Sequence, residues 1–256
     1  MKYLCLGPAS MGIFAMIGTL KALEPRLGEV EEISGASAGS ILALFLALGM
    51  SVDDILEHTL KVDIPNFVKL SLACFINKFG FVDMGPIREL LVSMCGGRDP
   101  TFADLDMKIY ISAYCLNTTR TEYFSKDTHP DMKVIDAVLM SIAIPMIFAS
   151  GSYDGKTYVD GGTMEKYPLN PFIGKKPHQV RTIVLKMERV YQDKIETPRQ
   201  FIEALVRSTL EHRTREDNLC EVTEINVGGV NVFNFNMEYE EKVKLFNIGF
   251  DVIKKL

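Results

Sequence analysis

The chain has 256 residues, 47% of them hydrophobic and 24% charged, and its 33 acidic and 28 basic side chains give a net charge of -5 at pH 7. This length and composition predict a single globular domain over residues 1–256, and the acidic balance excludes the basic surface that nucleic-acid binding needs. The five cysteines contain no C-x-x-C pair and the four histidines are dispersed, so we expect a reducing, cytoplasmic setting without disulfides, metal or cofactor.

The first fifty residues alternate between strand and helix patterns. Residues 2–6 predict a short buried strand that ends at Gly7-Pro8, because proline cannot donate to a β ladder. A helix, a second strand and a second helix that is apolar on all faces are expected over 12–24, 30–33 and 38–49. This order predicts parallel strands with right-handed crossovers, and therefore a three-layer α/β/α fold with a mostly parallel central sheet.

Two uncharged stretches, Tyr3 to Leu20 and Ile33 to Val52, are long enough for a membrane span or an export signal. Gly7-Pro8 interrupts the first apolar block, and the strongly apolar part of the second is only Ile41 to Leu48. Neither stretch predicts a transmembrane span. We therefore expect an intracellular protein, for which peripheral contact with a membrane stays open.

The rest of the chain continues the mixed pattern. Residues 52–97 are expected to be helical and are rich in Phe, Leu and Met. Further strands are expected at 108–115, at the end of TYVDGG (157–162), at 180–187 and at 230–235, and further helices at 132–143, 198–217 and 238–254. In the last helix one stripe carries Tyr239, Val243, Phe246, Phe250 and Ile253.

The stretch EEISGASAGSILALFLALG, residues 31–49, places one hydroxyl between small residues where a strand passes into a helix. The sequence Gly35-Ala36-Ser37-Ala38-Gly39 fits G-x-S-x-G, the nucleophile elbow, in which a sharp turn exposes the serine. The helix N-terminus adds N–H groups and a positive dipole end near a developing oxyanion. Taken alone, the pentapeptide fits a helix cap equally well.

The position of Ser37 argues against an α/β-hydrolase, because only 36 residues precede it and that fold places several strands before its nucleophile. A triad of Ser37, Asp160 and either His178 or His212 can be written, but both histidines lie in polar segments typical of the surface. A serine without histidine needs another base. Asp160 ends a strand and is followed by two glycines that permit unusual backbone angles and close approach.

These motifs together resemble the patatin-like phospholipase family, whose members use a Ser/Asp dyad. Three blocks carry the likeness: the loop Gly7-Pro8-Ala9-Ser10-Met11-Gly12, the G-x-S-x-G at 35–39, and Asp160-Gly161-Gly162. The segments SIAIPMIFAS (141–150) and YPLNP (167–171) agree with it. The resemblance covers roughly residues 3–172.

The resemblance implies a phospholipase A type lipid acyl hydrolase, a serine esterase that acts on phospholipid or other acyl esters without calcium. Ser37 would be the nucleophile that carries the acyl group, Asp160 its base, and the loop after the first strand the oxyanion hole. The family usually shows glycines followed by Arg or Lys in that loop. Here Pro8 lacks an N–H, so donation would come from Ala9, Ser10 and Met11.

The substrate surface and two alternatives stay open at this point. The Phe-, Leu- and Ile-rich residues of 61–95 could line an acyl groove or meet a lipid surface, although we expect most of them in the core. The same serine would also serve an acyltransferase or thioesterase. The altered loop is compatible with a catalytically weak lipid-binding domain. Headgroup preference, ester position and oligomeric state are not predicted.

Overall fold

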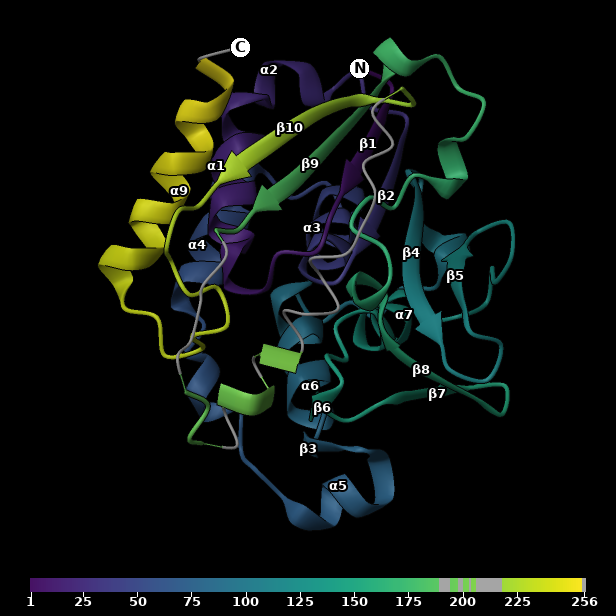
Figure 1. The fold of residues 1–256 in the computed structure, drawn as a ribbon. Helices are drawn as coiled ribbons and strands as arrows, with labels where there is room; N and C mark the ends of the chain where they lie inside the picture. The colour runs from purple at the N-terminus through teal and green to yellow at the C-terminus, as the bar shows by residue number, and fades with distance from the viewer. Residues whose placement is uncertain (189–193, 198–199, 203, 206–217, 255–256) are drawn as a thin grey trace.

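The computed structural model describes residues 1–188, 194–197, 200–202, 204–205 and 218–254 (Figure 1). The strands are β1 (Tyr3–Leu6), β2 (Glu32–Ala36), β3 (Gly80–Val82), β4 (Lys108–Cys115), β5 (Arg120–Ser125), β6 (Met146–Phe148), β7 (Gly151–Tyr153), β8 (Lys156–Asp160), β9 (Val180–Lys186) and β10 (Glu221–Asn226). The α-helices are α1 (Ile13–Ala22), α2 (Glu24–Leu27), α3 (Ala38–Ala47), α4 (Val52–Lys61), α5 (Leu72–Lys78), α6 (Gly85–Met94), α7 (Val134–Ser141) and α9 (Tyr239–Lys254).

The central sheet has the strand order β10-β9-β1-β2-β4-β8-β7, and β5 pairs with β4. The strands from β10 to β4 are parallel to one another, whereas β5, β7 and β8 join in antiparallel fashion. The predicted α/β fold with a mostly parallel central sheet is therefore confirmed. Because parallel strands end at one edge, the carboxyl ends of β1 and β2 lie side by side, with Leu6 opposite Gly35.

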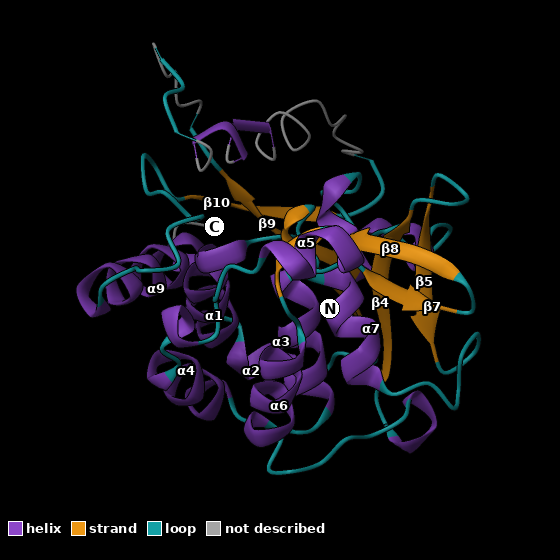
Figure 2. Cartoon of the chain, turned by 90° about the horizontal axis from the view of Figure 1, so that it is seen from below, coloured by secondary structure: helices purple, strands orange, loops and turns teal. Residues whose placement is uncertain are grey.

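The two faces of the sheet are covered differently. Helices α1, α3, α7 and α9 gather on one face, as Figure 2 shows. Leu4 and Leu6 of β1 belong to the core on that face, whereas Tyr3 and Cys5 pack on the other with residues from 167–172. Successive residues of a strand point to opposite faces, and each face of β1 packs against an apolar core. For this reason β1 is buried along its whole length.

The C-terminal helix is fixed against the N-terminal one by a close helix crossing. A Cβ atom on Gly249 would lie 1.8 Å from the Ala15 carbonyl oxygen, and one on Gly18 would lie 2.0 Å from the Phe246 carbonyl oxygen. Thr19 Oγ1 also donates to the Gly249 carbonyl at 3.0 Å. These glycines let α1 and α9 approach to backbone contact, so the two ends of the described chain share one core.

The helix expected over 238–254 is confirmed, since α9 spans Tyr239–Lys254. Its buried residues are Leu245 and Gly249; of the stripe named above, Phe246 and Ile253 pack against the core, whereas Tyr239 is 62% exposed. Of the helix expected over 198–217, residues 200–202 and 204–205 are helical, and the remainder lies outside the described residues.

The strand expected at 230–235 is wrong, because this stretch forms turns and the edge strand β10 lies at Glu221–Asn226. Three asparagine side chains accept the N–H two residues further on: Asn226 from Gly228, Asn231 from Phe233 and Asn234 from Asn236, at 2.9, 3.1 and 3.2 Å. Such local bonds compete with a β ladder and favour turns.

The region expected to be helical over 52–97 is only partly so. It contains α4, α5 and α6, but the short strand β3 separates α5 from α6 and pairs with β6 in a small second sheet. Residues of α5 are exposed or half-buried, with none in the core. The core placement expected for most apolar side chains here is therefore wrong for α5 and its flanks, where Leu70, Leu72, Ile76 and Phe79 are 77, 67, 67 and 64% exposed.

Candidate active site

Ser37 lies at the turn between β2 and α3. It is the N-cap residue of α3 and has a φ of 53°, a positive value that residues other than glycine rarely adopt. A Cβ on Gly35 would lie 2.6 Å from the Gly39 carbonyl oxygen, and one on Gly39 would lie 2.2 Å from the Leu6 carbonyl oxygen. The small residues on either side of Ser37 therefore let the helix start pack directly on the ends of β1 and β2.

The structure brings Ser37 and Asp160 together, although 123 positions separate them. The Ser37 hydroxyl donates to Asp160 Oδ2 at 2.6 Å, and both residues are buried, at 5 and 4% exposure. The second carboxylate oxygen, Oδ1, accepts the N–H of Gly162 at 2.6 Å. The carboxylate is thus held by a donor on each oxygen, with one oxygen aimed at the serine.

The position of Asp160 is fixed by strand pairing in the central sheet. Asp160 is the last residue of β8 and pairs with Ala113 on β4, the strand that adjoins β2. The turn that follows it, η4 (Gly161–Thr163), packs against the loop after β1, where a Cβ on Gly162 would lie 2.5 Å from Pro8 Cβ. Close approach accounts for all the motif glycines, since a Cβ on any of them would fall within 3.0 Å of another heavy atom: Gly7, Gly12, Gly35, Gly39, Gly161 and Gly162.

The end of α7 and the residues after it contact both members of the pair, which sequence reasoning did not anticipate. The Ser37 backbone N–H donates to Ser141 Oγ at 2.9 Å, and the Asp160 N–H donates to the Ala143 carbonyl at 2.9 Å. Ser141 is fully buried. The likeness of residues 141–150 to the family's pattern was the available signal, but it did not reveal which atoms these residues contact.

The loop after β1 offers fewer free N–H groups than expected. The N–H of Met11 donates to the Val232 carbonyl at 2.9 Å. Pro8 has no N–H to give. Within the described part of the chain, no protein acceptor takes the N–H of Ala9 or of Ser10. Two of the three expected backbone donors are therefore available, and Met11 is committed elsewhere.

An apolar cavity opens beside Ser37. Apart from Ser10, Ser37 and Thr59, the described residues that line it are apolar. They come from helices α1, α3 and α6, from strand β6 and from the turns and loops around them: Met11, Ile13, Phe14, Ala38, Ile41, Phe45, Val62, Ile64, Phe67, Ile87, Leu90, Leu91, Met94, Ile142, Ile144, Phe148 and Phe235. Part of the apolar segment 61–95 therefore lines a groove next to Ser37. This agrees with the expectation that the segment could line an acyl groove.

The described histidines are not placed to serve as the base, since none of them lines this cavity. His178 is exposed in η6 (Pro177–Gln179), just before β9, at the amino end of the parallel strands and therefore opposite Ser37. His129 packs against Phe124, and burial lowers its pKa. His212 lies outside the described residues.

In the described ranges, no three His, Cys, Asp or Glu side chains converge in a way that would hold a metal ion. The helices of the same ranges include none that combines the length and apolar character of a membrane span.

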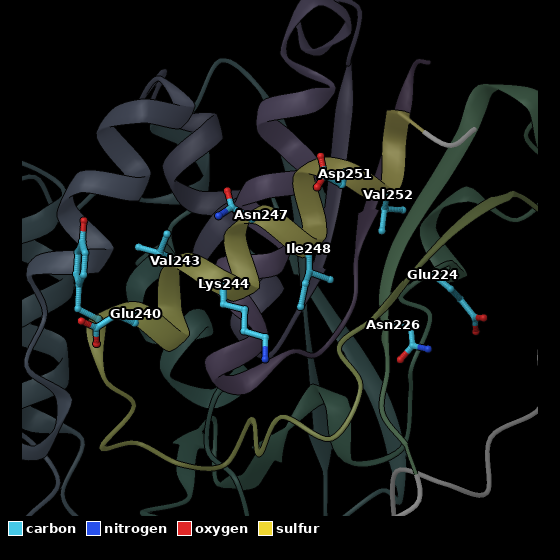
Figure 3. Close-up of a pocket in the computed structure, with 10 residues that line it drawn as sticks. Glu224, Asn226, Glu240, Val243, Lys244, Asn247, Ile248, Asp251 and Val252 are labelled. Carbon is cyan, nitrogen blue, oxygen red and sulfur yellow. The ribbon is translucent and has the colours of Figure 1, made fainter.

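A second hollow lies between α9 and the edge strand β10 (Figure 3). Its charged lining residues are Glu224 from β10 and Glu240, Lys244 and Asp251 from α9. It contains neither Ser37 nor any other residue of the three motifs. The cavity at Ser37 is therefore the candidate active site.

The chain is similar in sequence to several known proteins. A family model described as "Patatin-like phospholipase" matches residues 4–173. "Uncharacterized protein R571" of Acanthamoeba polyphaga mimivirus is 30% identical over 181 residues, 67% of this chain and 61% of that protein. "Probable lipid hydrolase 463L" of Invertebrate iridescent virus 6 is 26% identical over 175 residues, 64% of this chain and 60% of that protein. The chain thus spans about three-fifths of the length of these relatives.

Among solved structures, VipD from Legionella pneumophila is similar in fold. The TM-score is 0.69 at 16% sequence identity, over 99% of this chain and 66% of that one. At this identity the likeness concerns the fold alone.

Proposed function

The chain belongs to the patatin-like phospholipase family, and we propose from this premise that it is a lipid acyl hydrolase of the phospholipase A type. The observation that carries the proposal is the buried contact between the Ser37 hydroxyl and Asp160 Oδ2 at the edge of an apolar cavity. A hydroxyl paired with a buried carboxylate has a proton acceptor within reach, which a serine nucleophile requires.

The proposed reaction uses these two side chains in turn. The Ser37 proton passes to Asp160 Oδ2 while Ser37 Oγ bonds to the ester carbonyl carbon, and the carbonyl π electrons move onto the carbonyl oxygen. The bond to the leaving alcohol then breaks, and Asp160 returns the proton to that alcohol. Water repeats both steps on the acyl-enzyme, so that a fatty acid leaves and Ser37 regains its proton.

The negative oxygen formed at each step needs donors. We assign this role to the N–H groups of Ala9 and Ser10 and to that of Ala38, which as the first residue of α3 lacks an intrahelical acceptor. Met11 is left out of this assignment because its N–H is bonded to Val232. The start of α3 adds a positive dipole end beside Ser37.

The apolar cavity would receive the acyl chain. Its walls beside Ser37 include Phe14, Ile41 and Ile144, which exclude water and favour hydrocarbon. Exclusion of water also strengthens the electrostatic stabilisation of the oxyanion, because interactions between charges weaken as the dielectric constant rises. The proposed substrate is therefore a long-chain acyl ester, and the proposed partner surface is a lipid aggregate that supplies it.

The exposed apolar residues of α5 suggest how the enzyme would reach such a surface. The segment that runs into α5 contributes Ile64 and Phe67 to the cavity wall and then exposes Leu70 and Leu72. Figure 1 shows α5 at the end of the molecule toward which β1, β9 and β10 run. Ser37 follows the carboxyl end of β2, which is parallel to β1, and therefore lies toward the same end. We therefore propose that α5 inserts into a phospholipid bilayer as a peripheral contact.

Replacing Leu72 and Ile76 together by serine should weaken binding to phosphatidylcholine vesicles by about a hundredfold or more, because each inserted side chain of this size contributes more than about 1.4 kcal/mol, a factor of ten for each. Turnover of a soluble short-chain ester should stay unchanged, since neither residue lines the cavity. Vesicle flotation measures the first effect. Ile173→Ser, at an equally exposed residue before β9, is the matched control, and vesicle binding unaffected by the α5 variant would place the contact elsewhere.

Incubation of the protein with phosphatidylcholine should release fatty acid and lysophospholipid in equal amounts, and EDTA should not slow the release. Mass spectrometry of the products measures both, with acyl-CoA as a parallel substrate. Release of fatty acid from acyl-CoA alone would favour a thioesterase, and appearance of the acyl group on an added alcohol would favour a transferase. Absence of any product from the wild-type protein would contradict the proposed activity.

A further inference from the structure

Ser10 carries a hydroxyl for which the fold provides no partner. Its Oγ atom is buried, and no described residue lies within hydrogen-bonding reach of it. Its backbone has a φ of 48°, a conformation that favours glycine over residues with a side chain. A buried hydroxyl without a partner and a strained backbone are both unfavourable for the folded state, so their combination indicates a functional role.

The loop that contains Ser10 is short of donors. Pro8 has no N–H, the N–H of Met11 is bonded to Val232, and that of Gly7 is bonded to the Ile183 carbonyl at 3.0 Å. The loop therefore offers an oxyanion hole fewer backbone N–H donors than a run of glycines would offer. A side-chain hydroxyl in this loop can supply one further donor.

The packing of the loop brings Ser10 into the cavity of Ser37. Ser10 and Ser37 line the same cavity. Two residues of the same loop contact the elements that hold the dyad: the Gly7 carbonyl oxygen would lie 2.7 Å from a Cβ on Gly39, and Pro8 packs against Gly162. The loop thus packs between the start of α3, where Ser37 is the N-cap residue, and the turn that follows Asp160.

We propose that the Ser10 hydroxyl donates a hydrogen bond to the oxyanion of the tetrahedral intermediate at Ser37 and so acts as a side-chain member of the oxyanion hole. This proposal rests on the serine acyl-transfer chemistry proposed above. No proton is transferred by Ser10: when the carbonyl π electrons move onto oxygen, the Ser10 O–H donates to that oxygen, and it releases the oxygen when the carbonyl re-forms. Ser37 and Asp160 keep their roles.

Ser10→Ala keeps the backbone N–H and removes only the hydroxyl. We expect kcat for a soluble acyl ester to fall about 10²- to 10³-fold with little change in KM, the effect of losing one donor that acts in the transition state. Inhibition by an alkyl trifluoromethyl ketone, which forms a tetrahedral adduct with the serine, should weaken by a similar factor. The urea midpoint of unfolding should be equal or higher, because the variant no longer buries an unpaired hydroxyl.

Two further variants separate this role from a structural one. Ser10→Gly also removes the hydroxyl but suits the positive φ, so it should fold at least as well as wild type and lose the same activity. Ser34→Ala removes another buried, unpartnered hydroxyl, on β2 and outside the cavity, and should leave kcat unchanged.

Full activity in Ser10→Gly, or an equal loss in Ser34→Ala, would overturn the assignment while leaving the proposed function intact. A wild-type protein that neither turns over the ester nor binds the ketone would overturn the proposed function, and the Ser10 assignment with it.

Discussion

Replacing Asp160 by asparagine should lower kcat for an acyl ester by about 10²- to 10⁴-fold, the range that a positioned general base contributes. Asparagine has nearly the same shape, and its carbonyl oxygen can still accept the Gly162 N–H. In place of Oδ2, however, it presents an NH₂ group, which donates and cannot take the Ser37 proton. The loss should appear in kcat measured with a soluble ester at saturating concentration.

Asp154→Asn provides the matched control for this experiment. Asp154 lies in the exposed turn between β7 and β8, with a φ of 49° that asparagine tolerates well, so the same chemical change there should leave activity and stability unaltered. Urea unfolding should show that Asp160→Asn is folded. A folded Asp160→Asn variant with normal turnover would mean that another group serves as the base.

Ser37→Ala should abolish turnover, with a loss on the order of 10⁴- to 10⁶-fold, because without the hydroxyl no acyl-enzyme can form. Labelling by a fluorophosphonate probe should disappear in the same variant. Ser93→Ala, which removes an exposed hydroxyl on α6, should label like wild type. Labelling that persists in Ser37→Ala would show that a different side chain is the activated nucleophile.

The backbone at Ser37 adds a second readout to that experiment. Alanine keeps the strained φ of 53°, whereas glycine adopts it without a side-chain penalty. We therefore expect Ser37→Gly to exceed Ser37→Ala in unfolding free energy by about 1 kcal/mol, although both are inactive. Equal stabilities would mean that the elbow is not strained in solution.

Local sequence was sufficient wherever the residue type itself restricts the backbone. The elbow at Ser37 and the turn after Asp160 were predictable because small residues are needed where elements approach closely, and a Cβ on any of the motif glycines would fall within 3.0 Å of another heavy atom. The strand Lys108–Cys115 was predicted with its bounds, since alternating, β-branched stretches favour extended backbone. The asparagine turns of 226–236 are equally local, because each asparagine side chain accepts an N–H two residues further on, and they account for the absence of the strand predicted over 230–235.

Contacts between distant segments could not be predicted in this way. Nothing in the sequence near Met11 indicates that its N–H bonds to Val232, or that Ser141 accepts the N–H of Ser37. The apolar residues of α5 look like core residues by composition, and only their position on a projecting helix exposes them. Burial depends on what packs around a side chain as much as on the side chain itself.

The sequence by itself determined the class of fold, the elbow and the residue types of the candidate pair, because turn geometry and hydrophobic period act over a few neighbouring residues. The tertiary structure alone decided that the two side chains meet at 2.6 Å, since the pairing of β2 and β8 with β4 brings Ala36 opposite Ser112 and Asp160 opposite Ala113. It also decided which donors of the loop are free and which apolar residues line the cavity. Sheet order is set by packing over the whole chain, and no short stretch of residues encodes it.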